Sequence, residues 1–303
     1  MSKLSRYVKA AKAEGTRRLY ESNWRLFIDW CMERGYQPIP AAPEHVAEYL
    51  ADMANQGYKV RTIKNRLSTI NQKHRQAGYR RPCEHFIVSE TLKGICRVHG
   101  ATPEKKAPAT LKVIRDMVAR LRDDLIGIRD KALLLIGFAG ALGRLELVSL
   151  NVGDVEETSG GLILTVHRSK MDQEGRGRKV GIPYGSDPSI CPVRALKVWL
   201  ETSGIKTGPV FRKIDRHGNI GDRALTNHAI ALIIKRSAEA AGYDPKEFSG
   251  LSLRAGFVTT ASTAGVDDRV IVKHTGHRSV ESIYHYVRDG DLFRDNAVKD
   301  IGL

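Results

Sequence analysis

Long apolar runs and paired cysteines are both missing from this 303-residue sequence. No apolar run reaches the roughly 18 residues that a membrane-spanning helix needs, and the first residues lack the apolar core of a signal peptide. The four cysteines, at positions 31, 83, 96 and 191, form no Cys-x-x-Cys pair and show no zinc-like spacing. These absences predict a cytoplasmic protein with reduced thiols, no membrane contact and no metal ion.

Acidic residues are also scarce, and one long stretch has none. The chain carries 49 Lys and Arg against 34 Asp and Glu, a formal net charge of +15. No carboxylate lies between Asp52 and Glu84. A surface of this kind attracts polyanions with a salt-dependent affinity, although a charged stretch can also be an ordinary solvated helix face. We predict that the cations of this stretch bind the phosphates of double-stranded DNA: Lys59, Arg61, Lys64, Arg66, Lys73, Arg75, Arg80 and Arg81.

Apolar residues recur at helical spacing through the first hundred residues. Trp24, Phe27 and Cys31, for example, lie three and four residues apart, which places them on one face of a helix. Prolines at positions 38, 40 and 43 interrupt this pattern. The spacing predicts helices at about residues 17–32, 43–56, 60–77 and 89–98.

A change of composition separates this helical part from the rest of the chain. Residues 99–109 are rich in small, charged and proline residues, which is typical of a linker. We therefore predict a helical domain over residues 1–98, a linker over residues 99–109 and a larger domain over residues 110–303.

Two runs of alternating apolar residues interrupt the helical pattern of the larger domain. They cover residues 162–166 and 180–183, and they predict two strands joined by a Gly-rich turn. The expected fold is therefore mainly α-helical with a small β-hairpin or sheet. Lys170 lies in the turn, where its ammonium group is a mobile point charge.

The end of the chain holds three side chains suited to phosphoryl transfer. The guanidinium of Arg254 can bind two phosphate oxygens at once, and the imidazole of His277 can donate to phosphate or move a proton near neutral pH. The hydroxyl of Tyr286 can attack phosphorus covalently. Each residue alone is more often structural, but their order and spacing favour breakage of DNA strands without a metal.

These motifs resemble those of the tyrosine recombinase (phage-type integrase) family over nearly the whole chain. Arg254 matches the arginine of the family's His-x-x-Arg pair, and His277 lies in its Gly-His box. Tyr286, nine residues later, matches the nucleophile, whereas Tyr284 is two residues out of register. Lys170 matches the hairpin lysine.

The resemblance carries several expectations about structure and activity. It implies a helical core-binding domain followed by a catalytic domain, the two closing as a clamp on duplex DNA. It also implies strand cleavage through a 3′-phosphotyrosine intermediate without a cofactor, and a homo-tetramer or mixed tetramer on DNA. In this chemistry Lys170 assists the leaving 5′ oxygen, while Arg254 and His277 stabilise the pentavalent phosphate.

Two positions depart from the family pattern. Gly143 stands where the family has the first catalytic arginine, and Leu251 replaces the histidine of His-x-x-Arg and can neither donate a hydrogen bond nor carry a proton. We expect residues 140–147 to be helical, so that Gly143 costs about 1 kcal/mol relative to alanine. Arg144 would then be rotated by about 100° and would not replace the missing arginine. Loss of one transition-state donor typically slows a reaction by about 10²–10³, so we predict impaired activity.

Three functions remain open at this point. The first is an integrase-like DNA recombinase of a mobile element with an impaired site, which the retained catalytic residues favour. The second is a non-catalytic DNA-binding member or a partner in a mixed tetramer, which the two substitutions favour. The third is a relaxing topoisomerase of related chemistry, and the domain pattern favours it least.

Overall fold

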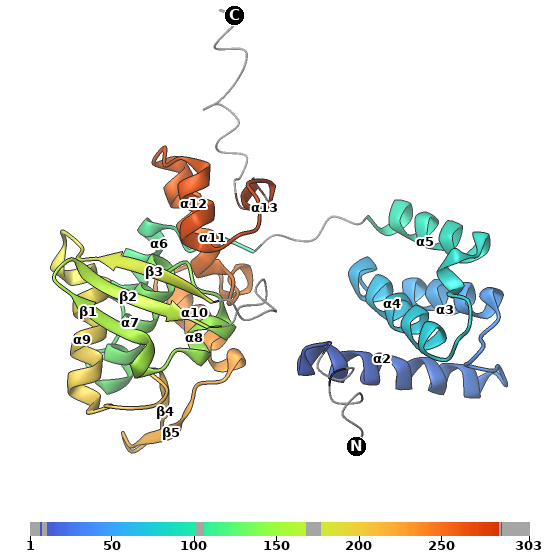
Figure 1. Ribbon diagram of the computed structural model, residues 1–303, viewed down its shortest axis with the longest axis horizontal. Helices are drawn as coiled ribbons and strands as arrows, with labels where there is room; N and C mark the ends of the chain where they lie inside the picture. Colours follow the sequence, from blue (N-terminus) through green and yellow to red (C-terminus); the bar gives the residue numbers. More distant parts are fainter. Residues whose placement is uncertain (1–6, 8–10, 101–105, 168–176, 285, 287–303) are drawn as a thin grey trace, which may run out of the picture. The chain divides into compact units, whose positions relative to one another are not determined.

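Helices dominate the structure, and the chain forms two compact units, residues 1–104 and residues 105–303 (Figure 1). The computed structural model describes residues 7, 11–100, 106–167, 177–284 and 286. The expectation of a mainly α-helical fold with small antiparallel sheets is confirmed. Within these ranges, no helix is both long enough and apolar enough to cross a membrane.

The described part of the first unit is a bundle around one apolar cluster. Its elements are α2 (Glu14–Glu33), α3 (Pro43–Asn55), α4 (Val60–Gln76), the 3-10 turn η1 (Pro82–Glu84) and α5 (Phe86–His99). Phe27, Leu50 and Ile63 are completely buried in this cluster, and the ring of Phe27 meets that of Tyr49 edge-on at 5.0 Å between centroids. The helices begin and end within a few residues of the predicted bounds because the apolar spacing marks the buried face.

The second unit is larger and also mainly helical. Its helices are α6 (Leu111–Ala119), α7 (Leu125–Ala139), α8 (Arg144–Ser149), α9 (Pro192–Ser203), α10 (Asn227–Ala240), α11 (Ser252–Thr263), α12 (Asp268–Thr275) and α13 (Glu281–Tyr284). Three short 3-10 turns accompany them: η2 (Val152–Asp154), η3 (Pro188–Ile190) and η4 (Pro245–Glu247). Leu133, Leu134 and Ile136 of α7 are completely buried. This central helix therefore forms the middle of the apolar core.

A three-stranded antiparallel sheet in the order β1-β2-β3 packs into this unit. Its strands are β1 (Val155–Thr158), β2 (Gly161–Val166) and β3 (Arg178–Pro183), and the two predicted strands fall within β2 and β3. The β2–β3 register runs from the Gly161–Pro183 pair to the Val166–Arg178 pair. Lys170 lies between these strands, outside the described residues. A separate hairpin, β4 (Arg212–Ile214) and β5 (Ile220–Ala224), was not predicted.

The expectation that residues 140–147 are helical throughout is wrong. Helix α7 ends at Ala139, Ala141 adopts a left-handed backbone conformation (φ 47°), and α8 begins only at Arg144. Gly143 is the N-cap of α8, with φ −80° and ψ 164°. Glycine is well tolerated at an N-cap, so the helix-interior penalty does not apply. Because residues 140–143 are not helical, the expected 100° rotation of Arg144 away from position 143 does not apply either.

Close backbone contacts fix the start of α11 against the segment that enters the unit. The amide of Ala109 donates to the carbonyl of Ser252 at 2.8 Å, and that of Ala107 donates to the carbonyl of Glu247 at 2.6 Å. A Cβ atom at Gly256 would lie 1.8 Å from the carbonyl oxygen of Ala109, so only glycine permits this approach. The first turn of α11 is therefore held rigidly.

Candidate active site

Arg254 is held by α11 in a polar cluster within the second unit. Its side chain is buried, with the residue 6% exposed. The Nη1 atom donates to Oε2 of Glu146 at 3.2 Å, and Nη2 donates to the carbonyl of Thr275 at 2.6 Å. Burial is the main influence on its pKa and lowers it, whereas the charge of Glu146 acts in the opposite direction. These contacts fix the guanidinium between α8 and the end of α12.

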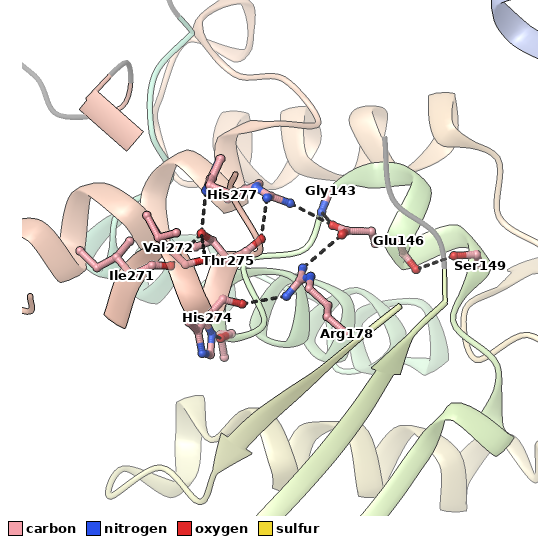
Figure 2. Close-up of polar contacts among 11 residues, drawn as sticks. Gly143, Glu146, Ser149, Arg178, Ile271, Val272, His274, Thr275 and His277 are labelled. Carbon is pink, nitrogen blue, oxygen red and sulfur yellow. Dashed lines mark hydrogen bonds and ion pairs between the residues drawn. The ribbon is translucent and has the colours of Figure 1, made fainter. Parts of the chain in front are cut away.

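Glu146 is the shared acceptor of this cluster (Figure 2). Its Oε2 atom accepts from the amide of Gly143 at 2.6 Å in addition to Arg254, and its Oε1 atom accepts from Nη2 of Arg178 at 3.1 Å. Glu146 is 4% exposed. Two guanidinium groups thus face one carboxylate, which leaves the cluster with one excess positive charge.

His277 follows directly on the glycine that ends α12. Its Nδ1 atom lies 2.6 Å from Oγ1 of Thr275, and the same hydroxyl donates to the carbonyl of Ile271 at 2.7 Å. With the single proton of the Thr275 hydroxyl donated to Ile271, the hydrogen between Thr275 and His277 is assigned to Nδ1. The neutral imidazole therefore presents an unprotonated Nε2 atom.

The surroundings of His277 keep the ring neutral at physiological pH. Burial first, then the charges of Arg254 and Arg178, lower its pKa from 6.5 to about 4. A base with so low a pKa accepts a hydrogen bond more readily than a whole proton. In the free protein His277 is therefore a neutral polar group of the cluster.

The lowered pKa of His277 has a consequence for stability. Between pH about 6.5 and about 4 the unfolded chain binds a proton on this side chain that the folded chain does not. We therefore expect the free energy of unfolding to fall as the pH falls through this window. Chemical denaturation at pH 7 and pH 5 should show a smaller pH effect in His277→Gln than in the native protein. Since His74 and His274 remain in both proteins, an equal pH effect would contradict this assignment.

Tyr286 lies beside His277, with 5.6 Å between the two ring centroids. The amide of Tyr286 donates to the carbonyl of Ile283 at 2.8 Å, and the carbonyl of Tyr286 accepts from Oγ1 of Thr259 at 3.0 Å. The ring packs on a small apolar cluster that includes Ile283. Tyr284, by contrast, is 55% exposed. The described part of the chain thus brings Arg254, His277 and Tyr286 together.

Gly143 and Leu251, which we predicted from the sequence to be substituted catalytic positions, lie at the edge of the same cluster. Gly143 offers only its backbone amide, and a Cβ atom there would lie 3.3 Å from Oε2 of Glu146. Leu251 is the N-cap of α11 and is 51% exposed. Arg144 lies across Gly250, since a Cβ atom on that glycine would be 1.8 Å from its Cδ atom. The side chain of Arg144 therefore lies against Gly250, the residue before Leu251.

The predicted DNA-binding residues fall into two groups. Arg61, Lys64 and Arg75 are exposed and lie on one face of α4, beside the face that carries its buried apolar residues. Arg66, by contrast, donates to the hydroxyl of Tyr49 at 2.9 Å and stacks over Tyr58 at 4.7 Å. The other predicted residues are Lys59 at the N-cap of α4, Lys73 with its ammonium 6.0 Å from the Trp24 ring, and Arg80 and Arg81 beside Glu84.

Sequence reasoning did not find Arg178, although it connects three elements of the cluster. No feature of the local sequence distinguishes it from other basic residues at strand ends. Within the described ranges, no three His, Cys, Asp or Glu side chains gather as a metal site requires.

The part of the chain that contains this cluster matches a family model. Residues 109–291 match the model of the phage integrase family. The chain is also 36% identical over 301 residues to an integrase/recombinase xerD homolog of Selenomonas ruminantium, covering 98% of this chain and 88% of that relative. The chain therefore belongs to the phage integrase (tyrosine recombinase) family.

Solved structures with the same fold share much less sequence. One is the Tn1549 transposon integrase in complex with transposon right end DNA, with a TM-score of 0.68, 15% identity and coverage of 96% of this chain and 93% of that one. Another is a lambda integrase dimer bound to a COC′ core site, with a TM-score of 0.61, 15% identity and coverage of 95% and 76%. At this identity the likeness establishes the fold alone.

Proposed function

We propose that this protein is a site-specific DNA recombinase that cleaves one strand at a time through a 3′-phosphotyrosine link to Tyr286, at a rate reduced by its two substitutions. One observation carries the proposal: the Tyr286 ring lies beside His277, in the cluster that buries Arg254. A phenol, an imidazole and a guanidinium gathered in this way suit attack on a phosphate diester.

The reaction conserves the phosphate ester at every step. The phenol of Tyr286 gives its proton to solvent, its Oη atom attacks phosphorus, and the bond from phosphorus to the 5′ oxygen breaks. Lys170 protonates the leaving 5′ oxygen, and Arg254 donates to the phosphate oxygens that gain charge. Attack by a 5′ hydroxyl of a second DNA end reverses the step and releases the tyrosine. The family role of Lys170 is carried over by its sequence position.

The two substitutions remove donors at the points where negative charge develops. Gly143 has no side chain to reach the phosphate, and Leu251 cannot donate or accept a proton. Each lost donor costs about 10²–10³ in rate, and the members of one cluster are not additive. We infer slow cleavage from the retained groups.

Covalent trapping is the experiment that tests this proposal. The substrate is a duplex drawn from the DNA that flanks the native gene and nicked close to the scissile phosphate. The short strand then diffuses away after cleavage, so that the adduct accumulates. A protein–DNA adduct that survives denaturant would support a working recombinase. Tight DNA binding with no adduct, even after the two positions are repaired, would overturn it.

A second candidate function is a non-catalytic DNA-binding member or a partner in a mixed tetramer. It is favoured by Leu251, which is half exposed beside Arg254 and offers no polar atom from its side chain. Mixing this protein with a catalytically competent family member would test it. Enhanced cleavage by the mixture, with no adduct on this chain, would support the partner function.

We also propose that the protein binds double-stranded DNA with both units, acts in the cytoplasm as a homo-tetramer or mixed tetramer, and needs no cofactor. The first unit would be the core-binding domain and the second the catalytic domain of a clamp. Two relatives of the same fold were solved with DNA, one of them as a dimer. The exposed cationic face of α4 supports a contact with phosphates.

The cationic face of α4 gives a prediction that does not depend on cleavage. In Lys64→Gln and Arg75→Gln we expect weaker DNA binding and a salt dependence of log K that is shallower by about one per residue. Lys197→Gln is a matched control, because its ammonium already pairs with Glu157 at 2.7 Å. Fluorescence anisotropy over a range of salt concentrations measures both quantities. Unchanged slopes in both variants would remove α4 from the DNA interface.

A further inference from the structure

Arg178 lies where β3 meets α8 and α12 in the second unit, and the proposed reaction gives it no role. It is the first residue of β3 and pairs with Val166 at the last described rung of the β2–β3 hairpin. The side chain is 18% exposed. It therefore lies at the end of β3 that follows the chain segment containing Lys170.

The guanidinium of Arg178 bridges two different elements (Figure 2). Its Nη1 atom donates to the carbonyl of His274 near the end of α12 at 2.7 Å, and its Nη2 atom donates to Oε1 of Glu146 in α8 at 3.1 Å. The stem of the side chain also lies against Gly276, because a Cβ atom there would be 2.7 Å from Cδ of Arg178. One residue thus contacts α8 and both sides of the turn before His277.

The turn held by Arg178 contains a glycine in the left-handed conformation. Gly276 has φ 69° and ψ 28°, the left-handed conformation that ends α12. Any side chain at Gly276 would meet Arg178 as well as strain the backbone. The packed stem therefore limits the directions in which His277 leaves the helix.

We propose that Arg178 is a positioning residue of the active site, which holds Glu146 against Arg254 and fixes the turn that presents His277. The proposal rests on the proposed function and extends it to a residue outside the family's catalytic set given above. Arg178 donates to the carbonyl of His274 and to Glu146, so we assign it an action through these groups, whereas Arg254 is the arginine that matches the family's catalytic set.

Only an arginine side chain can make this set of contacts. A planar guanidinium donates in two directions at once, whereas a lysine ammonium is a single compact charge on a flexible stem. Arg178→Lys keeps the charge and loses the bridge, and Arg178→Met keeps the stem and loses both. The two variants together separate geometry from charge.

The titration midpoint of His277 is a measurement that a purely structural role of Arg178 would leave unchanged. The groups that face this cluster are Glu146 from α8, Arg254 from α11, Arg178 from β3, His274 from α12, and Tyr286. Arg178 is one of the two cations that lower the pKa of His277. Removing its charge should therefore raise the titration midpoint of His277.

The test compares Arg178→Lys, Arg178→Met and the control Lys179→Met in the full-length protein. Lys179 is the next residue of β3, is exposed and points to the opposite face. At saturating DNA we expect both Arg178 variants to form adduct about 10- to 100-fold more slowly, as a shift of about 1 Å in catalytic groups produces. The control should match the native protein. An unchanged rate in both Arg178 variants would overturn the proposal.

Two further measurements keep the inference separate from the proposed function. NMR titration of His277 in the free protein needs no cleavage, and we expect an upward shift of its midpoint in Arg178→Met but not in Lys179→Met. A double-mutant cycle with Glu146→Gln should be non-additive, because Arg178 acts through that carboxylate. If no variant forms an adduct, the proposed function fails while the NMR shift still decides the role of Arg178. An unmoved His277 midpoint in folded Arg178→Met would reject it.

Discussion

The double substitution Gly143→Arg/Leu251→His is expected to raise the first-order rate of adduct formation by at least about 10²-fold. Each restored donor replaces a contribution of about 10²–10³ to transition-state stabilisation. Because members of one catalytic cluster act together, the combined gain should not equal the product of the two single gains. The rate is measured on the nicked duplex at saturating DNA, by quenching samples in denaturant over time.

The structure indicates that both new side chains fit. At position 143 the backbone has φ −80°, which any residue adopts, and a Cβ atom would lie 3.3 Å from Oε2 of Glu146. A shift of a few tenths of an ångström in that carboxylate relieves the contact. The new guanidinium would start beside Glu146, at the edge of the cluster that contains Arg254. Leu251 is 51% exposed, so histidine removes little buried apolar area there.

A matched control adds the same two side chains elsewhere in the second unit. Leu145→His changes a leucine of almost equal exposure, 52%, and Gly181→Arg places an arginine where a Cβ atom meets nothing within 4 Å. This Gly181→Arg/Leu145→His protein should cleave at the native rate. Equal rates in the repaired, control and native proteins would show that positions 143 and 251 do not limit cleavage.

The sequence was sufficient to predict the four helices α2 to α5 of the first unit because each one has a buried face with regular apolar spacing. The bounds of α3 and α4 fell within one residue of prediction, since Pro43 and the apolar residue Val60 begin them. The β2–β3 pair was predicted for the same reason, with Leu164 and Val180 paired and buried. Strand β1 and the β4–β5 hairpin were missed because they are short and lack a clear alternation of buried and exposed residues.

The active-site cluster could be predicted only in part. Arg254, His277 and Tyr286 carry a family spacing, and the structure brings them together. Arg178 has no such signal, because its burial depends on the meeting of β3 with α8 and α12 in the folded unit. The helical interpretation of residues 140–147 was wrong for a similar reason. The left-handed Ala141, which has no side-chain signature, separates α7 from α8.

Tyr286→Phe is expected to abolish the covalent adduct completely in both the native and the repaired protein. The Oη atom forms the bond to phosphorus, so its loss removes the intermediate and does not merely slow its formation. The ring packs on the apolar cluster of α11 and α12 and stays in place in phenylalanine. We therefore expect the thermal stability and DNA affinity of the variant to remain close to those of the parent protein. Gel separation in denaturant detects the adduct.

Tyr284→Phe provides the matched control, because it removes a hydroxyl two residues away from a side chain that is 55% exposed. This variant should form the adduct at the parent rate, and mass spectrometry should find the nucleotide on the peptide that contains Tyr286. The geometry supports this choice, because the ring of Tyr286 lies 5.6 Å from that of His277 between centroids. Loss of the adduct in Tyr284→Phe, with retention in Tyr286→Phe, would instead make Tyr284 the nucleophile. It would also require α13 to turn its exposed side chain toward Arg254 on DNA.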